Sequence, residues 1–130
     1  MREIKFSLVF RDMWQSAGKY VPRVDQLTAI APHIIEMGCF ARVETNGGGF
    51  EQVNLLFGEN PNKAVREWTK PFNEAGIQTH MLDRGLNGIR MSPVPADVRK
   101  LFYKVKKAQG TDILRHQTSL REKRGITQVL

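Results

Sequence analysis

Three polar side chains that could serve an active site lie directly after an apolar run near the start of the chain. Residues 4–10 are typical of a buried strand, and Arg11, Asp12 and Gln15 follow them. In parallel α/β folds, side chains at the carboxyl ends of strands face the ligand. Asp12 could therefore hold a metal ion while Gln15 meets a substrate. An aspartate after a strand also forms turns for structural reasons, so both interpretations stay open at this point.

Polar side chains also end two later strand-like runs. Residues 40–44 end in Glu44, and residues 77–82 are followed by Arg84 and Asn87. Right-handed βα units in series place the carboxyl ends of their strands on one face. We therefore expect the polar side chains of three strand ends to gather at one edge of a sheet, which is where a barrel enzyme builds its site.

Alternating strands and helices must position these residues. Apolar side chains at helical spacing predict helices between the strands, and this alternation is typical of a parallel α/β fold. Pro32 is expected to kink the first helix, and Pro71 to break the third near Lys70. The expected elements are strands at 4–10, 40–44 and 77–82 and from 111–113 onward, helices at 24–37, 50–57, 61–74 and 96–109, and a tight glycine loop at 45–49.

Length and composition indicate a folded domain. The 130 residues fit one domain or a part of a larger one. Hydrophobic residues make up 41% of the chain and charged residues 25%, which permits a packed core and excludes a disordered chain. No segment approaches the roughly 18 apolar residues that a membrane span needs. We therefore expect a cytoplasmic protein with no membrane span.

The formal net charge of +7 suggests nucleic-acid binding at first sight. Much of the positive charge lies on residues 96–109 and near the carboxyl terminus. Leu101, Val105 and Ala108 recur there at helical spacing, which predicts an amphipathic helix with a solvated basic face. Because no nucleic-acid-binding motif accompanies the charge, we do not expect nucleic acid to be the ligand.

Four motifs between residues 3 and 112 together resemble the carboxyltransferase domain of biotin-dependent enzymes. They are Arg-Asp-x-x-Gln-Ser at 11–16, Glu44 before a glycine run, Glu-Asn-Pro at 59–61 and Met-Leu-Asp-Arg-Gly-Leu-Asn at 81–87. This family includes the oxaloacetate decarboxylase alpha subunit, pyruvate carboxylase and the carboxyltransferase subunit of transcarboxylase. The resemblance implies a TIM barrel with a divalent metal ion at the carboxyl face of its strands. It also implies a reaction that moves carboxylate between carboxybiotin and pyruvate, with oxaloacetate as the carboxylated partner.

The resemblance assigns roles to four of the polar residues. Asp12 matches the aspartate that coordinates the metal ion, and Gln15 matches a glutamine near the pyruvate and biotin site. Arg84 matches the arginine that holds the substrate carboxylate, and Asn87 lies in the same motif as a substrate-binding residue. A carboxylate suits Zn, Mn or Mg, which would act as a Lewis acid on pyruvate enolate. A guanidinium can donate two parallel hydrogen bonds to one carboxylate.

Two further charged residues each have two open interpretations. Arg11 either supports the site or makes a structural salt bridge, and Glu44 either supports the site or belongs to a structural ion pair. The sequence departs from the family at two positions of the last motif. Asp83 stands where the family has an apolar residue, and Leu86 stands where the family commonly has glutamine. The resemblance therefore leaves the details of the substrate open.

The chain is too short for a whole barrel, which needs roughly 200 residues. We assign residues 1–112 to the amino-terminal half of a carboxyltransferase barrel, with about four parallel strands, and residues 113–130 to a divergent basic tail. In the family, a carbamylated lysine and a His-x-His pair complete the metal shell, and both lie in the other half. A biotin-accepting Ala-Met-Lys-Met segment is also absent, so carboxybiotin would be carried elsewhere. We expect a truncated or frame-shifted enzyme, inactive alone, whose metal binds only in the complete barrel.

A half-barrel would leave two open sheet edges and an uncovered inner face. The apolar residues expected on that inner face are Phe6, Leu8, Val43 and Leu82. We therefore expect a homo-oligomer or a complementary half-barrel to cover these surfaces, and a helix in the tail from Thr118 or Ser119. The alternative function is a non-catalytic interaction module that binds a partner subunit or a polyanion.

Overall fold

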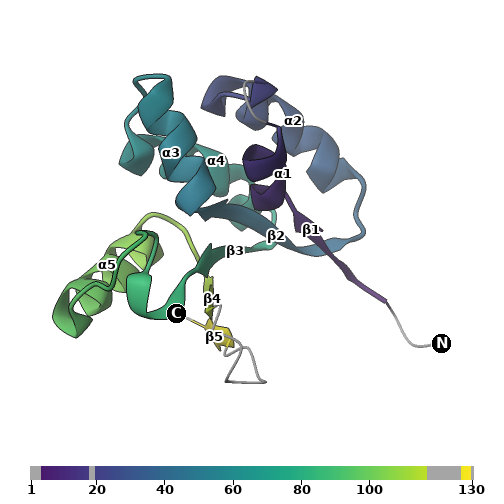
Figure 1. The fold of residues 1–130 in the computed structure, drawn as a ribbon. Coiled ribbons are helices and arrows are strands. Elements are labelled where there is room, and N and C mark those ends of the chain that lie inside the picture. Colours follow the sequence, from purple (N-terminus) through teal and green to yellow (C-terminus); the bar gives the residue numbers. More distant parts are fainter. Residues whose placement is uncertain (1–3, 18–19, 117–126, 130) are drawn as a thin grey trace.

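The computed structural model describes residues 4–17, 20–116 and 127–129, which form one sheet with helices beside it (Figure 1). Strands β1 to β4 are parallel and lie in chain order, and β5 pairs antiparallel with β4. The expectation of an α/β half-barrel with four parallel strands is confirmed. The strands are β1 (Phe6–Val9), β2 (Phe40–Gly47), β3 (Gln78–Asp83), β4 (Ile113–His116) and β5 (Thr127–Val129).

Helices connect each parallel strand to the next. None of the helices in the described part of the chain is long and apolar enough to cross a membrane. Helices α2, α3 and α4 cluster over β1 and β2, whereas α5 lies beside β3 and β4 (Figure 1). The helices are α1 (Arg11–Ser16), α2 (Val24–Glu36), α3 (Gly48–Leu56), α4 (Pro61–Glu74), the short 3₁₀ turn η2 (Gly85–Asn87) and α5 (Ala96–Ala108).

Several boundaries differ from the expected ones. Strand β2 continues through Gly47, where a loop was expected, because a register shift between Glu44 and Asn46 lets the strand absorb an extra residue. Helix α2 continues past Pro32, and α4 continues past Pro71 to Glu74, so the expected break in α4 was wrong. Buried side chains on both sides of Pro71 hold α4 in place, and this packing outweighs the lost backbone hydrogen bond.

The main apolar core lies between the sheet and helices α2, α3 and α4. Trp68 and Phe72 of α4 are fully buried, and their rings pack edge to face with centroids 4.8 Å apart. The Trp68 ring also contacts Phe10 at 5.5 Å, and its Nε1 donates to the carbonyl oxygen of Thr45 at 3.1 Å. This packing fixes α4 against β2 and thereby positions the carboxyl end of β2.

The two faces of the sheet carry different side chains from those expected. Leu8 and Val43 pack into the helix-covered core, so the prediction that they would point into the barrel was wrong. Strand alternation from Val43 instead places polar residues on the opposite face. That face carries Ser7, Val9, Arg42, Glu44, Gln78, His80, Leu82, Ile113 and Arg115. Because this face is largely polar, the apolar driving force that we expected for self-association through it is missing.

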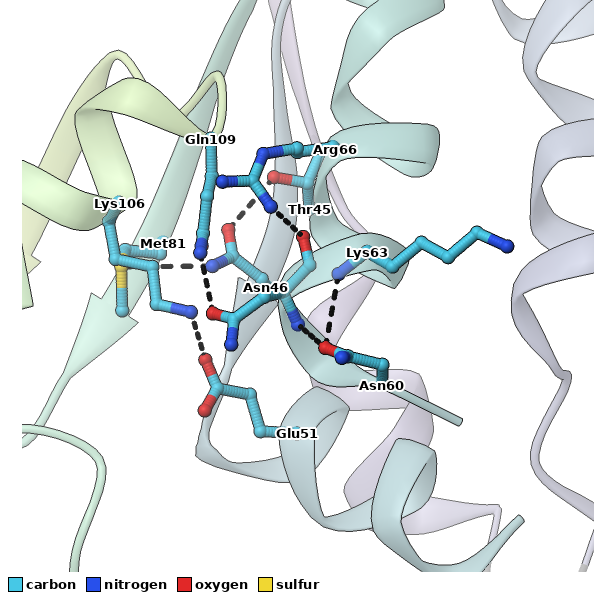
Figure 2. A network of polar contacts seen from close by, with 10 residues as sticks. Thr45, Asn46, Glu51, Asn60, Lys63, Arg66, Met81, Lys106 and Gln109 are labelled. Carbon is cyan, nitrogen blue, oxygen red and sulfur yellow. Dashed lines mark hydrogen bonds and ion pairs between the residues drawn. The ribbon is translucent and has the colours of Figure 1, made fainter. Parts of the chain in front are cut away.

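Helix α5 buries a different side from the one that its apolar spacing indicated. Leu101 is 62% exposed and Val105 is 39% exposed, whereas Lys106 is 2% exposed. Lys106 makes an ion pair with Glu51 of α3 (Figure 2). Its Nζ also lies 5.2 Å from the centre of the Phe102 ring. A lysine is buried at this depth only with such a partner, because an unpaired buried charge is costly.

Further polar contacts join α5 to α4 beside this ion pair (Figure 2). The Gln109 side chain donates to the Asn62 side chain at 2.5 Å. Asn60 caps α4, because its Oδ1 accepts from the backbone N–H groups of Asn62 and Lys63. The helix expected from Thr118 or Ser119 lies outside the described residues.

Candidate functional site

The first candidate residues lie on α1, directly beyond the carboxyl end of β1. Helix α1 begins at Arg11 without a side-chain cap, and Asp12 and Gln15 belong to it. Their backbone is therefore at the edge where the sequence placed the site. Their side chains lie outside the described part of the structure, so the metal-binding role of Asp12 and the substrate role of Gln15 stay predictions.

Arg11 and Glu44 come together in a buried ion pair at this edge. The Nε atom of Arg11 lies 3.4 Å from Oε1 of Glu44, and Nη2 of Arg115 donates to the same oxygen at 2.7 Å. Glu44 is fully buried and the Arg11 side chain is 9% exposed, whereas the Arg115 side chain is 41% exposed. Arg11 and Glu44 are thus partners in one ion pair, and Arg115 of β4 is a second cation bound to the same carboxylate.

Arg84 lies at the carboxyl end of β3 and holds the loop that follows it. Its Nη1 donates to the carbonyl oxygens of Ile89 at 3.2 Å and Arg90 at 3.1 Å, and lies 3.0 Å from the Met91 sulfur. Asn87 contributes to the same loop, because its side-chain amide donates to the Met91 carbonyl at 3.4 Å. These contacts fix the plane of the guanidinium beyond the end of the strand.

Two glycines at the start of α3 lie between Arg11 and Arg84. A Cβ at Gly47 would overlap the Arg11 side chain, whereas one at Gly48 would lie in ordinary contact with Nη2 of Arg84, at 3.4 Å. Glycine at position 47 therefore leaves room for the Arg11 side chain against the backbone. Helix α3 has no side-chain cap at Gly47, and a helix start attracts a negative group. The Arg84 guanidinium and the first turn of α3 thus lie beside each other, and both favour a negatively charged group.

Asp83 forms a buried junction next to Arg84. Its carboxylate accepts from the Tyr103 hydroxyl at 2.6 Å and from the Gly85 N–H at 2.9 Å, and it lies 2.6 Å from Nδ1 of His116. Burial, together with the hydrogen bond to Asp83, raises the pKa of Tyr103 above its usual value. The sequence marked Asp83 only as a departure from the family. Its partners Tyr103 and His116 come from α5 and β4 and could not be identified from spacing.

His80 lies beside Glu44 on the polar face of the sheet. Its Nε2 is 3.1 Å from the Ser7 hydroxyl. Burial, and then the positive charges of Arg115 and Arg42, lower the pKa of His80 to about 4. This histidine is therefore neutral near pH 7 and adds no positive charge to the edge.

The described residues do not by themselves form a metal site. Among them, no three His, Cys, Asp or Glu side chains are grouped so that they could hold a metal ion.

The fold is shared with carboxyl transferase domains, although no family model and no curated protein matches the sequence. The carboxyl transferase domain of Rhizobium etli pyruvate carboxylase matches with a TM-score of 0.77 and 18% identity, over 95% of this chain and 21% of that one. The same domain solved with pyruvate matches at 0.73 and 21% identity, over 89% and 20% of the two chains. Solved with 3-hydroxypyruvate, it matches at 0.72 and 24% identity, over 88% and 20%. The chain spans about a fifth of these structures, and it has the fold of one part of a TIM-barrel carboxyltransferase domain.

Proposed function

We propose that this chain forms the first part of a carboxyltransferase site that acts on pyruvate or oxaloacetate. Carboxybiotin on a separate carrier is the second substrate in this proposal. The observation that supports it most directly is the position of Arg84 over Gly48, at the edge where the shared fold has its strand ends. Structures of the Rhizobium etli domain were solved with pyruvate and with oxamate and biotin.

In this proposal Arg84 binds the substrate carboxylate. Its Nη1 is engaged by the carbonyl oxygens of Ile89 and Arg90, which leaves the Nη2 side of the guanidinium directed at Gly48. A carboxylate placed there would meet a charged donor and the N–H groups of the first turn of α3. The buried ion pairs of Glu44 keep Arg11 rigid on the other side of the two glycines.

A divalent metal ion enters the proposal through Asp12, with its other ligands outside the described residues. When bound, such an ion would supply Lewis-acid stabilisation of the enolate. Gln15, one turn further along α1, would contact pyruvate or biotin.

The test of this proposal is the binding of pyruvate to the full chain. Saturation-transfer NMR, from the protein to the methyl protons of pyruvate, measures this binding. Arg84→Gln should raise the dissociation constant by about tenfold to a hundredfold, because it removes a charged donor. Arg90→Gln is the matched control, since Arg90 is exposed on the same loop and only its carbonyl contacts Arg84. Equal binding by the wild type and Arg84→Gln would overturn the proposal.

A second candidate function is an interaction module for a polyanion. The exposed side of α5 favours it, because Lys100 and Lys104 stand beside the exposed Leu101. In this case heparin should bind the chain and release it as salt rises, and Lys100→Glu with Lys104→Glu should abolish retention. Retention that persists in this double variant would exclude α5 as the polyanion site.

A further inference from the structure

The loop after β3 brings a methionine sulfur against the guanidinium of Arg84. Nη1 of Arg84 lies 3.0 Å from the sulfur of Met91, and it also donates to the carbonyl oxygens of Ile89 at 3.2 Å and Arg90 at 3.1 Å. One nitrogen with two N–H groups thus faces three acceptors. The thioether sulfur is the weakest acceptor of the three, so a chemical change at this atom would alter how the guanidinium is shared among them.

The loop that carries Met91 is held by contacts of its own. The Val94 N–H donates to the Leu86 carbonyl at 3.0 Å. Nη1 of Arg99, near the start of α5, donates to the carbonyl oxygens of Leu86 at 3.0 Å and Val94 at 2.6 Å. All these residues lie between the end of β3 and the first turns of α5. The position of Met91 against Arg84 is therefore set within this loop and does not depend on an open edge of the sheet.

Met91 is the most exposed methionine in the described part of the chain. It is 81% exposed, compared with 64% for Met37 and 39% for Met13, whereas Met81 is fully buried. An oxidant in solution can therefore reach the Met91 sulfur without opening the fold. Oxidation of methionine gives the sulfoxide, which converts an apolar side chain into a polar one and which reductases reverse.

We propose that Met91 is a redox modification site that regulates Arg84. A peroxide transfers one oxygen atom to the Met91 sulfur: the S–O bond forms, the O–O bond breaks, and the proton goes to the departing oxygen. The sulfur loses two electrons and the peroxide is reduced to water or an alcohol. The sulfoxide oxygen then competes with the carbonyls of Ile89 and Arg90 for the guanidinium and turns Arg84 away from Gly48.

The effect on ligand binding rests on the proposed function, in which Arg84 binds the carboxylate of pyruvate. Oxidation of Met91 should then weaken pyruvate binding, and reduction of the sulfoxide should restore it. The change at Arg84 does not rest on that function, because it follows from the contact between the sulfur and the guanidinium alone. The two parts can therefore be tested separately.

The Nε–H resonance of Arg84, assigned by its absence from the spectrum of Arg84→Gln, tests the effect on the guanidinium. Hydrogen peroxide treatment of the full chain should shift this resonance, with peptide mass mapping to show oxygen uptake at Met91. Met91→Leu should show no shift on treatment. Met37→Leu is the matched control, because Met37 is exposed at the far end of α2, and it should shift like the wild type. An unchanged resonance in the oxidised wild type, or an equal shift in oxidised Met91→Leu, would overturn the proposal.

Pyruvate titrations before and after oxidation test the effect on binding, with each variant compared with its own untreated form. The dissociation constant should rise by about fivefold or more in the wild type and in Met37→Leu, and return after treatment with methionine sulfoxide reductase. It should stay constant in Met91→Leu. Equal binding by the untreated and the oxidised wild type would overturn the regulation of this site by Met91. Untreated protein that binds no pyruvate would instead contradict the proposed function, and the Arg84 resonance would still decide whether Met91 acts on the guanidinium.

Discussion

The Arg115 guanidinium donates a hydrogen bond to the Glu44 carboxylate, with 2.7 Å between Nη2 and Oε1. Glu44 lies on β2 and Arg115 on β4, so this bond crosses β3. Arg11, beyond the end of β1, reaches the same oxygen at 3.4 Å. One buried carboxylate on β2 thus ties β4 and the residue beyond the end of β1 to the middle of the sheet, and it should matter for folding whether or not the site binds a ligand.

Glu44→Gln should strongly destabilise the protein. The change removes the charge that two arginines share, and breaking a buried ion pair costs about 3–5 kcal/mol of unfolding free energy. Denaturant unfolding followed by circular dichroism measures the loss. Glu67→Gln is the control, because Glu67 is half exposed and its pair with Lys63 is a surface pair worth at most about 1 kcal/mol. Similar losses in the two variants would contradict the role assigned to Glu44.

Stability should fall as the pH drops, because of His80. The pKa of His80 is about 4 in the folded protein, below its ordinary value of 6.5, so the unfolded chain takes up a proton first as the pH falls. The contribution of neutral His80 is therefore complete above pH 6.5 and is lost progressively as the pH falls toward 4. The unfolding midpoint of His80→Gln should therefore depend less steeply on pH across this range than that of the wild type. His33→Gln is the control, because His33 is exposed, and its unfolding midpoint should depend on pH as steeply as that of the wild type.

The Tyr103 hydroxyl should resist ionisation at high pH. Burial and the hydrogen bond to Asp83 raise the pKa of Tyr103 above its usual value. Ultraviolet titration of the wild type should therefore show a late phenolate step, and Tyr103→Phe should remove it. The same variant should lose about 1–3 kcal/mol of unfolding free energy, since Asp83 loses a donor. A late step that persists in Tyr103→Phe would contradict this assignment.

Lys106→Met should be more harmful alone than together with Glu51→Gln. The single change leaves Glu51, which is 16% exposed, without its partner, at a cost of up to about 3–5 kcal/mol. Removal of both charges should restore much of that stability, and a double-mutant cycle measures the coupling. Lys107→Met is the control, because the Lys107 side chain is 49% exposed. Purely additive losses would show that the two side chains do not interact.

The order of elements and the meeting of strand ends could be predicted from the sequence. Arg11, Glu44 and Arg84 each follow or end an apolar run, and parallel topology brings such positions to one edge. The face to which Val43 points could not be predicted, because both faces of the sheet are partly apolar. The burial of Lys106 was also missed, since its partner Glu51 is distant in the sequence. Asp83 shows the same limit, because its contacts with Tyr103 and His116 exist only after folding.

An amide-resolved NMR titration of the full chain with pyruvate tests the carboxylate site at the start of α3 most directly. Saturable shifts are expected at the N–H groups of Gly48 and the residues that follow it, and at the Arg84 loop. Arg84→Gln should move the midpoint of these shifts to pyruvate concentrations about tenfold to a hundredfold higher, and Arg90→Gln should leave the midpoint unchanged. Shifts confined to α5, or no saturable shift at the start of α3, would contradict a carboxylate site at this edge of the sheet.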